Sequence, residues 1–66
     1  MYFTLADLVT GIFKGYIKEG EMFIALSNHD KLVYTGEALA WVTIEGYVST
    51  PLSVTAENIT ELYKRV

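Results

Sequence analysis

Few side chains in this sequence could carry out acid–base or metal chemistry. The one neighbouring His–acid pair is His29-Asp30, which could act as a general base or as part of a metal site. A metal hydrolase that uses such a pair needs further His or Cys ligands, and the chain has one His and no Cys. Asn28 and Asp30 both favour tight turns, so we interpret this segment as a solvated turn.

Nucleophilic and carboxylate chemistry also lack the groups they need. Ser27 lies two positions before His29, but no orienting third group and no glycine-rich oxyanion motif accompanies it. Glu57 and Glu61 are four residues apart, which would put both carboxylates on one helix face, opposite the apolar residues. A solvated helix surface is the simpler interpretation of that pair. We therefore predict that the protein is not an enzyme and that it uses no cofactor and no metal.

The residues that favour binding are aromatic. Aromatic side chains make up 14% of the chain, and such side chains are enriched at the centres of protein interfaces. In so small a protein, however, a residue such as Trp41 is more often part of the hydrophobic core than of a binding surface. We predict that four aromatic residues bind a partner: Phe23, Tyr34, Trp41 and Tyr47.

Size and charge narrow the class of partner. With 66 residues, no Cys and 52% hydrophobic composition, the chain has room for only a small core, and small scaffolds commonly gain stability from a second subunit. We therefore predict a homo-oligomer, a protein partner, or both. Five scattered basic residues against eight acidic ones disfavour direct nucleic-acid binding. The absence of a secretory signal and of a long apolar run predicts a cytoplasmic protein with no membrane contact.

The first element expected to position these residues is a helix. Apolar residues recur at three- and four-residue spacing, which predicts an amphipathic helix over residues 5–16. Thr4 is its expected cap, and Asp7 suits its first turn. Gly11 and Gly15 lower the helix propensity, so an earlier end stays open, and either glycine could allow a neighbouring segment to approach closely.

An antiparallel meander is expected after this helix. Residues 21–27 and 31–35 have strand character and are separated by turn residues. Residues 38–45 begin with helix-favouring Ala-Leu-Ala but continue with a β-favouring run, and we interpret them as a third strand. Gly46 then marks either a bulge or the start of a short fourth strand near residues 47–49.

The meander is predicted to be apolar on both faces. In its first strand Met22, Ile24 and Leu26 alternate with a set that includes Phe23. We expect the first set to pack under the helix. The other set holds Phe23 with Val33 or Tyr34, depending on register, and with Trp41 or Val42. It would form an aromatic face that the C-terminal helix covers only in part and that a partner would bury.

The chain is expected to end in a second helix. Thr55 is its predicted cap, and Ile59, Leu62 and Tyr63 would share its apolar face. The predicted fold is a single α+β domain over residues 1–66, with an N-terminal helix, an antiparallel three- to four-stranded meander and a short C-terminal helix.

Three segments together resemble small uncharacterised proteins encoded by phages and prophages of Gram-positive bacteria. These segments are Thr-Leu-Ala-Asp-Leu at 4–8, Ile-Lys-Glu-Gly-x-x-Phe at 17–23 and Tyr-Thr-Gly at 34–36. The resemblance implies a non-enzymatic protein that binds host proteins, including defence or replication factors. It implies no particular functional residues.

Two functional hypotheses follow from the sequence. The first is a non-catalytic interaction protein that acts as an oligomer and, in a phage setting, inhibits or modulates a host protein. The alternative is a binding module for a nucleotide-like small molecule, held at a subunit interface by Trp41 and tyrosines.

Overall fold

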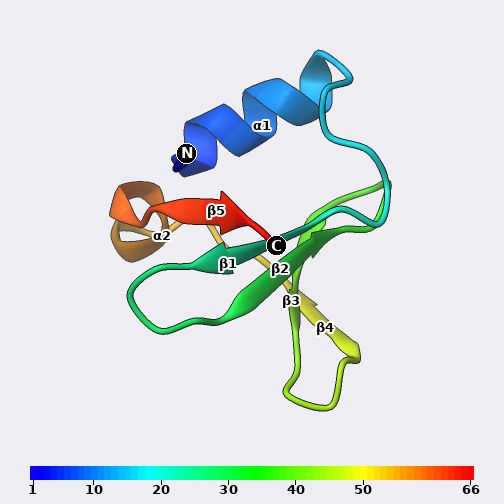
Figure 1. Ribbon diagram of the computed structural model, residues 1–66, viewed down its shortest axis with the longest axis vertical. Helices are drawn as coiled ribbons and strands as arrows, with labels where there is room; N and C mark the ends of the chain where they lie inside the picture. The colour runs from blue at the N-terminus through cyan, green and yellow to red at the C-terminus, as the bar shows by residue number, and fades with distance from the viewer.

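In the computed structural model, which describes residues 1–66, an N-terminal helix lies over one side of an antiparallel sheet and a short second helix lies beside the start of the last strand (Figure 1). The helices are α1 (Leu5–Phe13) and α2 (Ala56–Thr60). The strands are β1 (Met22–Ala25), β2 (Lys31–Tyr34), β3 (Leu39–Val42), β4 (Val48–Pro51) and β5 (Tyr63–Arg65). They form one five-stranded sheet in the order β4-β3-β2-β1-β5. The predicted α+β class, with an N-terminal helix, a meander and a short second helix, is confirmed.

The start of α1 follows the expected capping pattern. The Thr4 hydroxyl accepts a hydrogen bond of 3.1 Å from the Asp7 N–H, and the Thr4 N–H donates one of 2.9 Å to the Asp7 carboxylate. This reciprocal capping box satisfies two backbone donors that a helix start would otherwise leave unpaired.

The end of α1 comes three residues before the predicted end at Tyr16, because Gly15 terminates the helix. Gly15 has φ 82°, a left-handed conformation that L side chains rarely adopt. The N–H of Gly15 donates to the Ile12 carbonyl, and the N–H of Tyr16 donates to the Gly11 carbonyl. These two bonds are the Schellman motif, which closes the helix at Phe13.

The middle of the chain forms the expected meander, and residues 38–45 contain strand β3. Gly46 has φ 96° in the turn before β4, so the interpretation as the start of a short fourth strand is the one that applies. The irregularity in the β3–β4 pairing lies elsewhere, between Ala40 and Val42. Pro51 ends β4, which is an edge strand of the sheet. Proline has no backbone N–H, and at an edge this removes the fewest hydrogen bonds between strands. The β3–β4 hairpin projects away from the helices (Figure 1).

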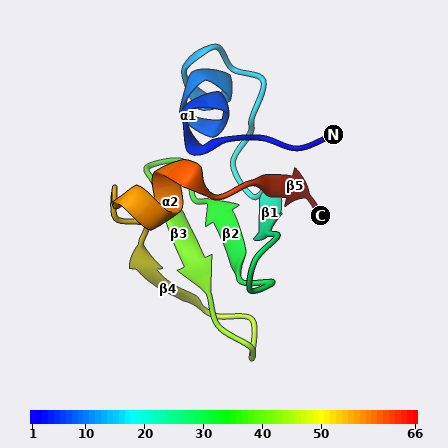
Figure 2. The same ribbon diagram turned by 90° about the vertical axis from the view of Figure 1, so that its left-hand side faces the viewer.

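The predicted C-terminal helix is too long. Thr55 caps α2 as expected, but α2 ends at Thr60, and the chain continues as β5 beside β1 (Figure 2). Tyr63 therefore lies in a strand opposite Ala25, and not on a helix face. Pairing with the open edge of β1 satisfies the backbone of residues 63–65 and buries the Tyr63 side chain, which together outweigh the local helix propensity.

The two faces of the sheet follow from the strand register, since directly opposed residues share a face. Phe23, Leu32 and Trp41 lie in one row, and this face packs against α1. The expectation that Met22 and Ile24 lie under α1 is therefore wrong, because the larger Phe23 set fills that space. The buried cluster between the sheet and α1 consists of Leu5, Leu8, Ile17, Phe23, Ala25, Leu32, Leu39 and Tyr63.

Candidate interaction surface

The face of the sheet that points away from the helices carries an apolar stripe. Met22 lies opposite Val33, Val33 opposite Ala40, and Ala40 opposite Pro51. Val66 extends this row, because its N–H donates a hydrogen bond of 3.1 Å to the Met22 carbonyl. This row of apolar residues, which we call the apolar stripe, thus crosses the sheet. Its end members Pro51 and Val66 are exposed, Met22 and Val33 are half-buried, and Ala40 is buried, at 4% exposure.

A second row beside the apolar stripe mixes aliphatic residues with lysines. Ile24 lies opposite Lys31 on one side and Lys64 on the other. Val42 lies opposite both Lys31 and Val48. The two lysines and Val48 are exposed, and Ile24 and Val42 are half-buried. The two rows together are the open sheet face.

No helix covers the open sheet face. α1 packs on the opposite face, and α2 lies on the same side as α1, because Glu57 and Asn58 of α2 line a hollow together with Ala25 and Trp41 of that face. Both views show α1 on one side of the strands (Figure 1 and Figure 2). The solvent-facing side of an antiparallel sheet is normally polar, so an uncovered apolar side indicates an interaction surface.

The four aromatic residues that were predicted to bind a partner do not form one surface. Phe23 is completely buried, and its ring meets the Phe3 ring edge-on at a centroid distance of 6.0 Å. Tyr34 and Trp41 are half-buried against the core. Tyr47 alone is well exposed, at 72%. The expected aromatic face is therefore mostly core, because α1 and α2 lie over it.

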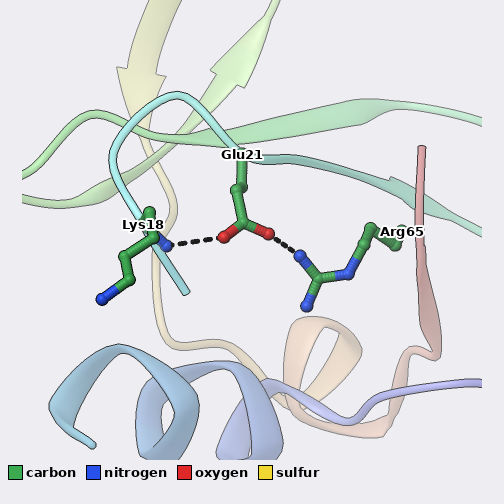
Figure 3. A network of polar contacts seen from close by, with 3 residues as sticks. All are labelled: Lys18, Glu21 and Arg65. Atoms are coloured by element: carbon green, nitrogen blue, oxygen red, sulfur yellow. Dashed lines mark hydrogen bonds and ion pairs between the residues drawn. The ribbon is translucent and has the colours of Figure 1, made fainter. Parts of the chain in front are cut away.

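A charged contact holds the last strand to the helix side of the molecule. The Arg65 guanidinium pairs with the Glu21 carboxylate, which also accepts a hydrogen bond of 2.8 Å from the Lys18 backbone N–H (Figure 3). The guanidinium carbon lies 5.3 Å from the centre of the Phe23 ring and 6.0 Å from that of Phe3, within the range of a cation–π interaction. The Arg65 guanidinium thus makes its charged and cation–π contacts within this protein.

The serine and carboxylates weighed for catalysis take part in structural contacts. The Ser27 N–H donates a 3.0 Å hydrogen bond to the Glu61 carboxylate, and the Ser27 hydroxyl donates to the same oxygen. The hydroxyl hydrogen bond lowers the pKa of the Glu61 carboxyl below its ordinary value. Ser27 thus bonds to Glu61 and not to His29. Glu57 and Glu61 do not share a helix face, because α2 ends between them.

The segment around the single His is a turn, as expected. The Asn28 side-chain oxygen accepts a hydrogen bond of 3.0 Å from the Asp30 N–H, which is an Asx turn. His29 itself takes the left-handed conformation, with φ 62°. No group of three or more His, Cys, Asp or Glu side chains is arranged to hold a metal ion.

A hollow of about 360 Å³ lies between the N-terminal segment, α1 and the last strand. Tyr2, Phe3 and Tyr16 supply aromatic walls, and the charged residues of the lining are Asp7, Lys14 and Arg65. Its volume falls within the range of small-molecule sites. Trp41 does not line it, so the tryptophan and the tyrosines are not gathered in one site.

The chain matches no protein-family model, no curated protein and no solved structure. The likeness to phage-encoded proteins therefore stays a prediction. No helix of the structure combines the length and apolar character that crossing a bilayer requires.

Proposed function

We propose that this chain is a non-catalytic interaction protein that binds another protein through its open sheet face. The observation that carries the proposal is the apolar stripe, which has one apolar residue in each of β1 to β4 and Val66 directly after β5, with neither helix packed on it. A chain of this size has little stability to spare. Apolar area of this kind is retained at the cost of solubility only where another surface covers it.

The proposal includes self-association through a second surface. Phe13 is 93% exposed at the end of α1, and Val9 and Tyr16 near it are also exposed. This helix-end surface lies on the opposite side of the molecule from the open sheet face. A dimer formed through the helix-end surface would leave the open sheet face of each protomer free to bind a partner. If the phage resemblance holds, the partner is a host defence or replication protein.

The test uses a variant that makes the open sheet face polar without changing its shape. Val33→Thr with Val42→Thr replaces one methyl by a hydroxyl at each of two outward positions. Wild-type protein should bind an apolar fluorescent dye in its folded state, and the variant should bind severalfold less. Circular dichroism controls for folding. A folded wild-type protein with no dye binding, at any oligomeric mass, argues against an interaction face.

Sedimentation equilibrium tests the self-association separately. Phe13→Ser should lower the average mass toward that of the monomer, whereas Val33→Thr with Val42→Thr should leave the mass unchanged. If only Val33→Thr with Val42→Thr lowered the mass, the protein would associate with itself through the open sheet face and not through the helix-end surface.

Small-molecule binding is a second candidate, favoured by the hollow lined by Tyr2, Phe3 and Tyr16. Aromatic walls beside the Lys14 ammonium suit an aromatic anion. A nucleoside monophosphate should raise the thermal midpoint of the wild-type chain, and Tyr16→Ala should remove that increase. Equal midpoints with and without the nucleotide would exclude this candidate for that ligand class.

A further inference from the structure

We propose that the open sheet face binds an acidic amphipathic helix of a different protein, and that a second copy of this chain does not occupy it. The proposal rests on the proposed function and specifies the chemistry of the partner. It is carried by the sign and spacing of the charges beside the apolar stripe.

The charged residues paired into the two rows of the open sheet face are both lysines, whereas Asp30 lies beside Lys31 and Val42, and Glu21, which pairs with Arg65, lies beside Met22 and Val66. Lys31 and Lys64 lie in the row beside the apolar stripe, and no acidic residue is paired into either row. The chain as a whole carries a net charge of −3, so the two rows are locally opposite in sign to the molecule. The single ion pair of the chain joins Arg65 to Glu21 and leaves both lysines without an acidic partner. An apolar surface flanked by carboxylates is the complement of this pattern.

A second copy does not provide that complement. Two open sheet faces packed against each other would gather four lysines around an apolar centre, and neither of the two rows on each face carries a carboxylate. Juxtaposed like charges oppose association across an interface. The stripe is also short, about 19 Å for four strand spacings, and its two rows lie about 7 Å apart along the strands. That footprint is well below the roughly 800 Å² per partner of a standard interface, and it suits a single segment.

The spacing of the lysines points to a helix. Lys31 is in β2 and Lys64 is in β5, with β1 between them, so they lie two strand spacings apart, about 10 Å. Carboxylates at positions i and i+7 of a helix are separated by about 10 Å along its axis. A helix of about 13 residues covers the length of the stripe. The expected partner segment therefore has an apolar face and acidic residues two helical turns apart.

The test selects displayed random peptides on the immobilised full chain and sequences the bound pool. The wild-type chain should enrich peptides that combine Leu, Ile or Phe with Asp or Glu at seven-residue spacing. Lys31→Glu with Lys64→Glu should reverse the charge preference to Lys and Arg. Val33→Thr with Val42→Thr should reduce the bound pool at least tenfold. Lys18→Glu reverses one positive charge on the α1 side, as Lys31→Glu does on the open sheet face, and only Lys31→Glu should change the selected sequences.

Folding of each variant is checked by circular dichroism and thermal unfolding. If Lys31→Glu with Lys64→Glu does not fold, Lys31→Gln with Lys64→Gln is used in its place. The Gln variant should lower the affinity for an enriched acidic peptide severalfold.

Each other outcome has a definite meaning. Apolar peptides enriched without acidic bias, or insensitive to the two lysines, would overturn the acidic partner and leave the interaction face standing. A bound pool no larger than that of Val33→Thr with Val42→Thr would overturn both proposals. Anionic lipid vesicles bound through Lys31 and Lys64, or self-association lost only in the sheet variant, would assign the face to a membrane or to a second copy.

Discussion

Individual side chains explain how the C-terminal segment is held to the sheet. Glu61 takes two hydrogen bonds from Ser27 in the turn after β1, and Arg65 pairs with Glu21 just before β1. Between these two contacts lies Tyr63, which is completely buried. The polar contacts are partly exposed, so the burial of Tyr63 contributes the larger share of the stability.

The Ser27–Glu61 contact predicts a dependence on acid pH. The folded state lowers the Glu61 pKa, so the contact stabilises the fold above about pH 4.3, the ordinary Glu value, and this contribution is lost as the pH falls through the lower folded pKa. Glu61→Gln should cost no more than about 1 kcal/mol at pH 7, because the contact is partly exposed. It should also weaken the loss of stability between pH 7 and pH 3. Urea unfolding at both pH values measures this, with Glu45→Gln as the control, and an unchanged acid dependence would contradict it.

Tyr63 predicts a dependence on alkaline pH. Burial raises the pKa of the Tyr63 phenol, and the negative charge of Glu61 raises it further. The neutral phenol, whose hydroxyl donates a hydrogen bond of 3.2 Å to the Asn58 carbonyl, stabilises the fold fully below about pH 10, and that contribution is lost as the pH rises through the higher folded pKa. Tyrosinate absorbance should show a late step that coincides with unfolding and is missing in Tyr63→Phe. A late step that persists in the variant would reassign it to another tyrosine.

Gly11 predicts an energetic coupling with Ile17. A Cβ atom at Gly11 would lie 2.8 Å from the Ile17 Cδ1 atom, and Ile17 is buried in the core. Gly11→Ala should therefore destabilise the chain, although Ala is favoured over Gly in a helix by about 1 kcal/mol. In an Ile17→Val background, which removes the crowding methyl, the same change should be neutral or stabilising. A double-mutant cycle measured by urea unfolding checks this, and additive effects would show that the close approach has no energetic cost.

At the scale of elements, α1 and the C-terminal segment differ in what determines them. The start and end of α1 come from local residues, namely the capping box at Thr4 and the left-handed Gly15. The C-terminal segment has no comparable local stop signal for α2. It becomes β5 because β1 offers an unpaired edge and Tyr63 fits the core there.

Lys64 distinguishes a strand from a helix at this position. It is exposed in β5, opposite Ile24. In a strand, Thr should be more favourable than Ala by up to about 1 kcal/mol. In a helix, Ala would be more favourable than Thr by about 0.5 kcal/mol. We expect Lys64→Thr to be more stable than Lys64→Ala in thermal unfolding, and the reverse order would be evidence for a helical C-terminal segment.

At the scale of the whole molecule, one sheet serves two purposes. Its helix-side face holds the core, and its open sheet face carries the apolar stripe. Neighbouring residues of β2 represent the two roles, since Leu32 is completely buried and Val33 is half-buried on the open face. The stability and the interaction properties of the protein should therefore respond to different substitutions.

Leu32 and Val33 provide a matched test of this separation. Leu32→Ala should destabilise the chain by about 2–5 kcal/mol, because it leaves a cavity in the core. Val33→Thr keeps the shape and the β propensity and should cost less than about 1 kcal/mol, while lowering binding at the open face. Urea unfolding measures both variants. A cost at Val33 equal to that at Leu32 would mean that a part of the chain covers the open face in solution.

The sequence by itself determined the features that depend on neighbouring residues. The α1 cap, the turn at residues 28–30, the third strand and the two apolar sets of β1 all follow from local propensity and periodicity. The sequence also indicated that one apolar sheet face would remain uncovered. It could not rank the two sets of β1, because both are apolar and alternation alone does not say which lies inward.

Only the tertiary structure decided which apolar face is open and how the chain ends. Phe23 lies in the core because it is paired with Leu32 and covered by α1. Met22 and Val33, which alternate with them, therefore lie on the open sheet face. The β5 strand likewise depends on an edge of β1 that is forty residues distant in sequence, as in the pairing of Phe23 with Arg65 (42 positions apart). Contacts of that range are set by packing and by pairing of free backbone groups, and no local pattern encodes them.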